Sequence, residues 1–272
     1  MIKAAVLGSP IAHSLSPLLH SIAYAELGIE GQYTRAEVKS GELAEFLAGC
    51  DDTWTGLSLT MPLKEEALDV TKDVSDLARR IRSANTLLRR EGEWNASSTD
   101  VSGFTHAFAA HGLDTCGDVL IIGGGATARA AAAACDGMAS RITIMNRTPS
   151  RIEALSNAVE SSDLDFISWD DAGIFESVDL IISTTPEGAS DGLIASFPSH
   201  PTGVFFDVLY KPWPTLALHT WSQRGAQVID GLDLLIHQGI DQVSLFSGMR
   251  IDRAPMAALM RKHALTALDS ST

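Results

Sequence analysis

The sequence predicts an α/β fold with largely parallel sheets. Short apolar segments typical of buried strands, such as residues 2–7 and 119–122, alternate with segments of helical pattern along most of the chain. Because a helix usually joins two parallel strands, this alternation favours parallel sheets. The 272 residues allow one or two domains, and a hydrophobic content of 45% is ample for their cores.

The first segments already show this alternation. A predicted strand over residues 2–7 ends at Gly8, and Ser16 before Pro17 predicts a helix start, with Ser16 as the N-cap and Pro17 as the first helical residue. Beside that helix N-terminus, Ser14 and Ser16 would also form a neutral cradle for a small carboxylate. Strands at 33–38 and 56–60, with a helix at 41–47 between them, are expected next.

Lys64 has an unusual predicted position. Pro62 lies near the start of a predicted helix, which puts Lys64 within the first turn. A cation there is repelled by the positive end of the helix dipole, so this position is unusual for an ordinary solvated lysine. Lys64 is therefore a candidate functional residue, with the solvated lysine as the plainer alternative.

The next stretch leads to a candidate carboxylate. Residues 73–82 predict a polar helix, and residues 83–98 predict a hairpin. Asp100 then precedes a further helix, and by its position it is interpreted as the N-cap of that helix. Asn85 is interpreted as a turn or edge residue.

Residues 119–133 predict a strand, a tight turn and a helix in direct succession. Gly123 and Gly125 occupy the first two positions of a G-x-G-x-x-G/A pattern, and Ala128 the third, where a small side chain lets the helix pack on the strand. Such a turn offers free N–H groups and the positive end of the helix dipole to a pyrophosphate. The pattern is typical of a Rossmann-type unit, although glycine-rich turns also occur without a ligand.

The second strand of this unit indicates which dinucleotide it binds. Residues 141–145 end at Asn146, Arg147 and Thr148, and Arg151 follows closely. An NAD site usually has Asp or Glu here for the ribose 2′-hydroxyl, whereas arginine and threonine suit a 2′-phosphate. The sequence therefore predicts NADP(H); a solvated basic turn is the alternative.

Further predicted strands complete the second half of the chain, at residues 165–168, 178–183, 204–208 and 226–229. The Rossmann-type unit is therefore expected over residues 101–236. Residues 1–100 and 237–272 are expected to form one other α/β domain together, with the final helices returning to it.

Composition excludes several classes of protein. The formal charge of −14 argues against a nucleic-acid or acidic-membrane surface. No apolar run approaches a membrane span, and the N-terminus lacks the form of a signal peptide, so the cytoplasm is the default expectation. Three widely spaced cysteines and eight histidines without metal-site spacing predict neither disulfides nor a metal.

Seven segments, taken together and in this order, resemble the shikimate dehydrogenase family of the aromatic amino-acid pathway. They are residues 8–17 (GSPIAHSLSP), 59–64 (LTMPLK), 84–87 (ANTL), 99–100 (TD), the glycine turn, 146–148 (NRT) and 231–238 (GLDLLIHQ).

The resemblance implies a role for each matching residue. Lys64 and Asp100 would be the catalytic pair. The substrate carboxylate would bind Ser14 and Ser16, and its ring and hydroxyls would be surrounded by Thr60, Asn85, Asp100, Tyr210 and Gln238. NADP(H) would be bound by Gly123, Gly124, Gly125, Ala126, Asn146, Arg147, Thr148, Arg151, Val208, Gly231 and Asp76.

The resemblance also implies a reaction, the reversible NADPH-dependent reduction of 3-dehydroshikimate to shikimate in chorismate and aromatic amino-acid biosynthesis. The protein would be a monomer or homodimer that binds neither nucleic acid nor membrane. Two segments depart from the family pattern: Ser98 stands where asparagine usually precedes the Thr-Asp pair, and residues 183–185 replace an Asn-Ala-Thr turn.

These departures leave alternatives open. A quinate or broad-specificity shikimate/quinate dehydrogenase is one alternative, although Ser14 and Ser16 favour shikimate because quinate-preferring relatives tend to vary there. A non-catalytic dinucleotide sensor is a remote second, disfavoured by the joint presence of Lys64, Asp100 and Asn85.

Overall fold

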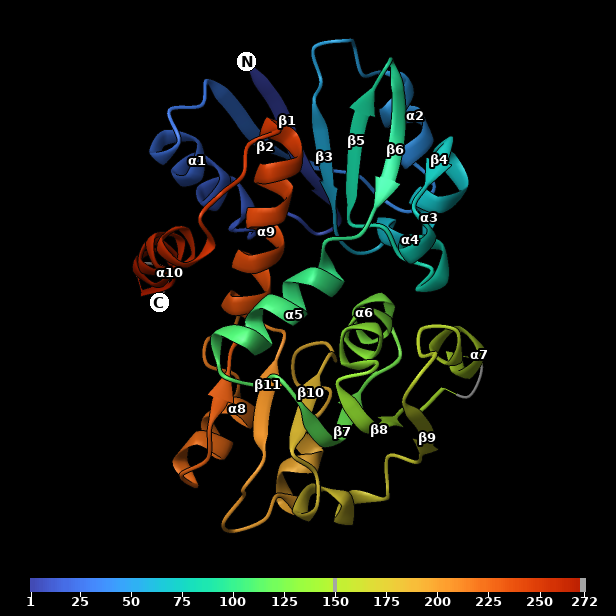
Figure 1. Ribbon diagram of the computed structural model, residues 1–272, viewed down its shortest axis with the longest axis vertical. Helices are drawn as coiled ribbons and strands as arrows, with labels where there is room; N and C mark the ends of the chain where they lie inside the picture. Colours follow the sequence, from blue (N-terminus) through green and yellow to red (C-terminus); the bar gives the residue numbers. More distant parts are fainter. Residues whose placement is uncertain (149–150, 270–272) are drawn as a thin grey trace. The chain divides into compact units, whose positions relative to one another are not determined.

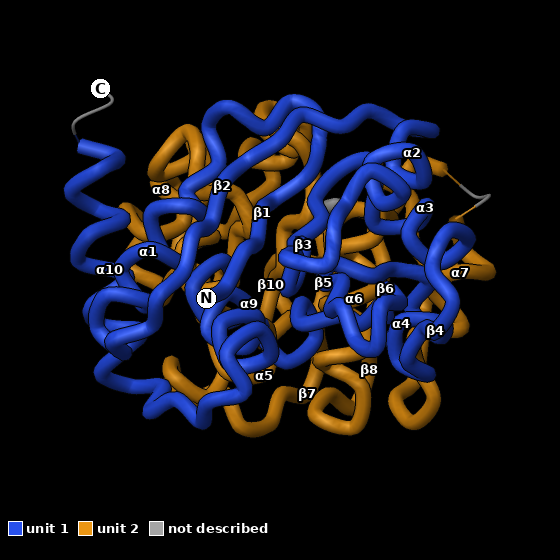
Figure 2. Tube along the Cα trace, turned by 90° about the horizontal axis from the view of Figure 1, so that it is seen from above, with its two compact units in different colours: residues 1–103, 235–272 blue, residues 104–234 orange. Residues whose placement is uncertain are grey.

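A computed structural model describes residues 1–148 and 151–269, and the chain divides into two compact units (Figures 1 and 2). Unit 1 comprises residues 1–103 and 235–272, and unit 2 comprises residues 104–234. Both divisions fall inside helices, α5 (Asp100–Ala110) and α9 (Gly231–Ser247). The boundaries expected from the sequence, after residues 100 and 236, lie within the same two helices.

Unit 1 contains a mixed six-stranded sheet in the order β2-β1-β3-β5-β6-β4. Its strands are β1 (Ile2–Gly8), β2 (Gly31–Glu37), β3 (Gly56–Leu59), β4 (Asp73–Val74), β5 (Thr86–Arg90) and β6 (Glu93–Ser97). The first three strands are parallel, β5 is antiparallel to both β3 and β6, and β4 is parallel to β6. The predicted hairpin is confirmed: Glu91 and Gly92 at its turn have φ of 51° and 81°, as a tight two-residue hairpin turn requires.

Two local predictions in unit 1 are wrong. Residues 73–82 do not form one helix, because Asp73 and Val74 pair with β6 and leave only the short helix α4 (Asp76–Arg80), which Ser75 caps. Ser16 is not an N-cap: α1 (Ser16–Glu26) has Leu15 at that position, without a side-chain cap. The Ser14 hydroxyl instead accepts a hydrogen bond from the Ser16 N–H at 3.3 Å.

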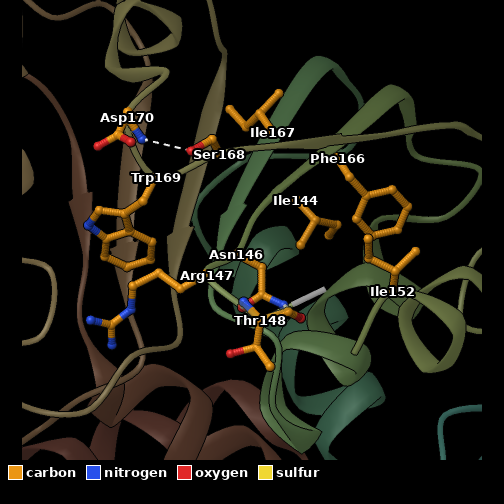
Figure 3. Close-up of a pocket in the computed structure, with 10 residues that line it drawn as sticks. All are labelled: Ile144, Asn146, Arg147, Thr148, Ile152, Phe166, Ile167, Ser168, Trp169 and Asp170. Carbon is orange, nitrogen blue, oxygen red and sulfur yellow. Dashed lines mark hydrogen bonds between the residues drawn. The ribbon is translucent and has the colours of Figure 1, made fainter. Parts of the chain in front are cut away.

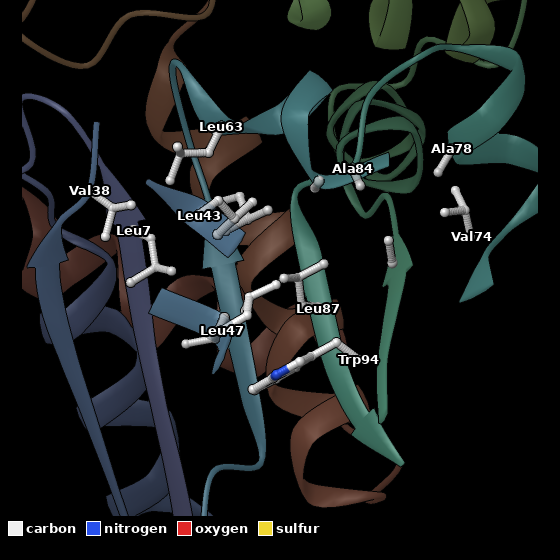
Figure 4. Close-up of a cluster of buried hydrophobic side chains, with 14 of the residues drawn as sticks. Leu7, Val38, Leu43, Leu47, Leu63, Val74, Ala78, Ala84, Leu87 and Trp94 are labelled. Atoms are coloured by element: carbon white, nitrogen blue, oxygen red, sulfur yellow. The ribbon is translucent and has the colours of Figure 1, made fainter. Parts of the chain in front are cut away.

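The two faces of this sheet are covered differently. On one face, leucines from the strands pack against α2 (Leu43–Ala48), α3 (Leu63–Val70) and α4, in the apolar cluster drawn in Figure 4. On the other face, α9 approaches β3 so closely that a Cβ on Gly56 would lie 2.2 Å from the Phe246 ring. Helices α1 and α10 (Arg253–Asp269) also belong to unit 1 and contact one another.

Unit 2 contains a fully parallel six-stranded sheet in the order β12-β11-β10-β7-β8-β9. Its strands are β7 (Cys116–Ile122), β8 (Ala139–Met145), β9 (Asp163–Ile167), β10 (Leu180–Ser183), β11 (Val204–Asp207) and β12 (Val228–Ile229). Besides its parts of α5 and α9, the described helices of unit 2 are α6 (Ala126–Cys135), α7 (Ile152–Ser156), α8 (Leu216–Gln223) and the 3₁₀ helices η2 (Ala172–Glu176) and η3 (Asp191–Ser196).

The strand order of unit 2 reverses between β7 and β10. Counted from β7, it is the 3-2-1-4-5-6 order of the Rossmann fold, in which ligands bind at the carboxyl ends of the strands beside the reversal. This confirms the predicted fold class. Across residues 1–148 and 151–269, none of the helices combines the length and the apolar character that a bilayer crossing requires.

Candidate active site and cofactor site

One edge of the unit 1 sheet gathers the ends of three strands. The parallel strands β1 and β3 end at Gly8 and Leu59, and β5 begins beside them because the Leu59 N–H donates to the Asn85 carbonyl at 2.7 Å. Gly8 must be glycine, since a Cβ there would lie 2.4 Å from the Thr60 methyl carbon Cγ2. Polar residues that follow or precede these strand ends, Thr60 and Asn85 among them, therefore share this edge.

Lys64 and Asp100 form an ion pair near this edge. Lys64 lies in the first turn of α3, as predicted, and its Nζ is 2.6 Å from Asp100 Oδ2. The two side chains are only 15% and 6% exposed, so water screens their attraction poorly. The pair places an ammonium and a carboxylate side by side, which is what proton transfer to a reacting oxygen requires.

Asp100 is not an N-cap. It is the first residue of α5, and its carboxylate is directed to side chains of unit 1. Oδ2 accepts from Lys64, and Oδ1 accepts from Asn85 Nδ2 at 2.8 Å. The carboxylate thus has ionic and amide partners that outcompete the N–H groups of its own helix.

Asn85 is the centre of the polar contacts, rather than a plain turn residue. Its Nδ2 donates to Asp100, to Thr99 Oγ1 at 3.0 Å and to Gln238 Oε1 at 3.2 Å. Its Oδ1 accepts from the Thr99 N–H at 2.7 Å. Gln238 lies on α9, far along the chain, and its contact with Asn85 brings Lys64, Asn85, Asp100 and Gln238 together.

The other expected substrate residues of unit 1 lie in segments next to this edge. Ser14 and Ser16 follow β1 and are 8% and 7% exposed. Thr60 follows β3, and its N–H donates to the Leu7 carbonyl at 2.9 Å. Thr99 was not among the predicted site residues, although it belongs to the 99–100 segment that carries the family resemblance.

In unit 2, the glycine turn between β7 and α6 is as tight as its pattern predicts. Gly123 has φ of 119°, and a Cβ on it would lie 2.4 Å from Thr184 Oγ1, so only glycine fits. Ala128 is fully buried against the strand. Helix α6 has no acidic residue in its first turn, which leaves its positive end free to attract a phosphate.

The basic loop after β8 adjoins this turn. Arg151 Nη1 donates to the Gly124 carbonyl at 3.2 Å, and a Cβ on Gly124 would lie 2.6 Å from Asn146 Nδ2. Asn146 shapes the loop by donating to the Thr148 carbonyl at 2.9 Å and accepting from the Thr148 N–H at 3.3 Å. No acidic residue occupies residues 146–148, so the loop fits a 2′-phosphate better than a free 2′-hydroxyl.

A cavity of about 560 Å³ lies beside the same loop (Figure 3). It is lined by Asn146, Arg147 and Thr148 on one side and by apolar side chains from β8, β9 and α7 on the other. The Arg147 guanidinium lies over the Trp169 ring, 5.1 Å from its centroid. Trp169 was not anticipated from the sequence; stacking of this kind holds the charge of Arg147 in place.

Val208 and Gly231, two other expected cofactor residues, lie against each other. A Cβ on Gly231 would lie 2.3 Å from the Val208 carbonyl oxygen, so α9 begins directly against the loop that follows β11. Asp207 fixes that loop: it accepts from Thr215 Oγ1 at 2.7 Å and from the Leu209 N–H at 3.1 Å, and burial raises the pKa of its carboxyl. Tyr210 lies in this loop, whereas Asp76 is an exposed residue of α4 in unit 1.

Known proteins show the same organisation. Residues 6–87 match the family model described as the shikimate dehydrogenase substrate binding domain, and residues 109–193 match the model described as shikimate / quinate 5-dehydrogenase. The NADP(+)-type shikimate dehydrogenase of one Thermus thermophilus strain is 34% identical over 96% of this chain and 98% of its own length.

Solved structures agree. The shikimate dehydrogenase of Mycobacterium tuberculosis superimposes with a TM-score of 0.88 at 32% identity, covering 96% of this chain and 100% of that one. A shikimate 5-dehydrogenase from a second Thermus thermophilus strain, solved in complex with NADP(H) and shikimate, gives 0.84 at 32% identity, covering 96% and 99%.

The fold and the site together define a dinucleotide-dependent oxidoreductase, with a Rossmann-type sheet in one unit and a buried lysine–aspartate pair in the other. At this level of identity over nearly its whole length, the chain belongs to the shikimate dehydrogenase family.

Proposed function

We propose that this protein is an NADP-dependent shikimate dehydrogenase that interconverts 3-dehydroshikimate and shikimate in chorismate and aromatic amino-acid biosynthesis. The observation that carries the proposal is the Lys64–Asp100 ion pair, held by Asn85, in a chain that also has a glycine turn and a basic loop suited to NADP. Relatives of the same length have this activity in their names.

In this proposal most substrate contacts come from unit 1 and most NADP(H) contacts from unit 2, with Tyr210 of unit 2 and Asp76 of unit 1 as the exceptions. Ser14 and Ser16 offer hydroxyls to the substrate carboxylate, and Thr60, Asn85, Gln238 and Tyr210 contact its ring and hydroxyls. The glycine turn and α6 hold the pyrophosphate, with Val208, Gly231 and Asp76 on the cofactor side. Asn146, Arg147, Thr148 and Arg151 hold the 2′-phosphate.

The chemistry assigned to the chain is proton transfer. When bound, the nicotinamide supplies or accepts the hydride. As the substrate carbonyl oxygen gains negative charge, the Lys64 ammonium stabilises it and gives it a proton; in the reverse direction the neutral amine takes the hydroxyl proton. Asp100 orients the amine and balances its charge, and Asn85 holds Asp100 in that orientation.

Steady-state rates of the purified protein with shikimate and with quinate, each against NADP⁺ and NAD⁺, test this proposal. The highest kcat/KM is expected for shikimate with NADP⁺. A clear preference for NAD⁺ would contradict the roles of Arg147 and Arg151. Binding of NADP without turnover would favour a dinucleotide sensor.

The same assay tests the quinate alternative, which one observation favours. Ser98 Oγ is buried and has no hydrogen-bond partner among the described residues, so the segment before Asp100 lacks a contact that a longer side chain could make. Comparable rates with quinate would establish broad specificity. A cytoplasmic location and a monomeric or homodimeric state stay predictions.

A further inference from the structure

A continuous chain of hydrogen bonds runs through the interior of unit 1 and ends at the Asp100 carboxylate. Its five bonds are Tyr33 OH to Ser58 Oγ at 2.7 Å, Ser58 Oγ to Gln242 Oε1 at 2.7 Å, Gln242 Nε2 to Thr86 Oγ1 at 3.0 Å, Thr86 Oγ1 to Asn85 Oδ1 at 2.9 Å, and Asn85 Nδ2 to Asp100 Oδ1 at 2.8 Å. All six residues are at most 5% exposed. Five of them come from β2, β3, α9, β5 and α5, and Asn85 immediately precedes β5.

Backbone groups fix the direction of the bonds at Gln242. Its Nε2 also donates to the Asn85 carbonyl oxygen at 3.3 Å, and a carbonyl oxygen can only accept. The other end of the amide, Oε1, therefore faces Ser58 and receives its proton. Because a serine hydroxyl has one proton to give, Tyr33 must donate to Ser58.

Backbone groups fix the direction at Asn85 as well. The Thr99 N–H can only donate, and it lies 2.7 Å from Asn85 Oδ1, so Nδ2 is the end that faces Asp100. Every donor from Tyr33 onward therefore points toward the carboxylate. Aligned bonds of this kind polarise one another and favour a negative charge at the accepting end.

Gln242 also connects the chain of hydrogen bonds to the backbone beside the reacting groups, at Asn85. It lies one helical turn after Gln238 on α9, so both side-chain amides project from the same side of the helix. Gln242 contacts the carbonyl of Asn85 and the hydroxyl of the next residue, Thr86. An apolar side chain of the same size would fill the space without the cost of burying an amide, so filling space does not explain glutamine here.

We propose that Gln242 is a positioning residue: through Thr86 and the Asn85 backbone, it holds the Asn85 amide against Asp100 and so sets the geometry of the catalytic pair. Gln242 itself touches neither Lys64 nor Asp100 in the hydrogen bonds of the described residues. The inference rests on the proposed function for the roles of Asn85 and Asp100.

The test variant is Gln242→Met, which keeps the length of the side chain and removes its hydrogen bonds. We expect kcat/KM for shikimate to fall about tenfold, with the KM for NADP⁺ unchanged, because the loss acts on the substrate side. Tyr33→Phe, which keeps the ring and removes only the far donor, is expected to lower kcat/KM in the same direction by about twofold to threefold.

Leu47→Ala is the control for a merely structural role. Leu47 is 7% exposed in the apolar cluster on the other face of the sheet, so its loss lowers the melting temperature without touching the hydrogen-bond chain. Leu47→Ala is expected to keep the wild-type kcat/KM below its melting temperature. If Gln242→Met also keeps kcat/KM within twofold of wild type, the positioning role is refuted.

A crystal structure of Gln242→Met separates this inference from the proposed function. The expected result is a shift of Thr86 and Asn85 that lengthens the Asn85–Asp100 contact from 2.8 Å to beyond hydrogen-bonding distance. An unchanged contact overturns the inference even if wild-type protein does not oxidise shikimate. Absence of wild-type turnover with shikimate, by contrast, refutes the proposed function alone.

Discussion

Lys64 Nζ and Asp100 Oδ2 lie 2.6 Å apart, although 36 residues separate them in the chain. Lys64 is brought there by the start of α3 and Asp100 by the start of α5, while Asn85 holds the second carboxylate oxygen.

Asp100→Asn should reduce turnover strongly. The amide removes the negative charge that balances and orients the Lys64 ammonium, and acid–base contributions of this kind are worth about 10² to 10⁴ in rate. Steady-state kinetics with shikimate and NADP⁺ give the comparison. Asp52→Asn is the matched control, because Asp52 pairs with Arg89 at 2.9 Å but is 95% exposed, so its pair contributes little.

Arg147→Ala and Arg151→Ala should each raise the KM for NADP⁺ by about tenfold or more and leave the KM for NAD⁺ nearly unchanged. In the proposed function each guanidinium makes charge-assisted hydrogen bonds with the 2′-phosphate, which NAD⁺ lacks. Arg141→Ala serves as the control, because Arg141 pairs with Asp165 at 3.6 Å near the start of its strand, away from the loop. An equal rise in the KM for NADP⁺ and the KM for NAD⁺ would show that these arginines do not recognise the 2′-phosphate.

Gly231→Ala should lower the free energy of unfolding by about 1 to 3 kcal/mol or more, because the new Cβ would lie 2.3 Å from the Val208 carbonyl oxygen. For Gly239→Ala, in the same helix, the added Cβ has no described atom within 4 Å apart from its chain neighbours and the nearby backbone of its own helix. It should be neutral or stabilise by up to about 1 kcal/mol through helix propensity. Urea unfolding of both variants checks the contrast, and similar midpoints for the two would contradict it.

His20 should make the protein less stable in mild acid. It is fully buried, stacked on Tyr33 with ring centroids 3.7 Å apart, and neither ring nitrogen has a hydrogen-bond partner among the described residues. Burial lowers the pKa of His20 to about 3, an effect that Gln242 partly offsets. The neighbouring Tyr24 and Tyr33 stay protonated, because burial raises the pKa of each phenol.

The unfolded chain therefore binds a proton at His20 below about pH 6.5 that the folded protein does not accept until about pH 3. Stability from this residue is complete above pH 6.5 and is lost as the pH falls, by about 2 kcal/mol at pH 5. His20→Phe keeps the stack and removes the titration, so the difference in unfolding free energy between pH 7 and pH 5 should shrink by that amount. An unchanged difference would exclude His20 as its source.

Features set by local sequence could be predicted. The glycine turn depends on a handful of adjacent residues, as do the hairpin at Glu91 and Gly92 and the first-turn position of Lys64. The backbone conformation of a turn depends on a few adjacent residues, so the local sequence determines it directly.

Features set by distant partners could not be predicted. Asp73 and Val74 form a strand only because they pair with β6. The Asp100 carboxylate is directed to Lys64 rather than to the N–H groups of its own helix. Gln242 joins Thr86 across 156 residues, and no local pattern marks that contact.

The measurement that tests the account most directly is the rate of NADPH formation by Lys64→Ala with saturating shikimate and NADP⁺. The control is Lys72→Ala, an exposed lysine that pairs with Glu93 at 3.1 Å. The turnover of Lys64→Ala is expected to be about 10² to 10⁴ lower than that of wild type, with a much smaller change in the KM for shikimate, and Lys72→Ala is expected to have wild-type rates. Near-normal turnover of Lys64→Ala would contradict this expectation.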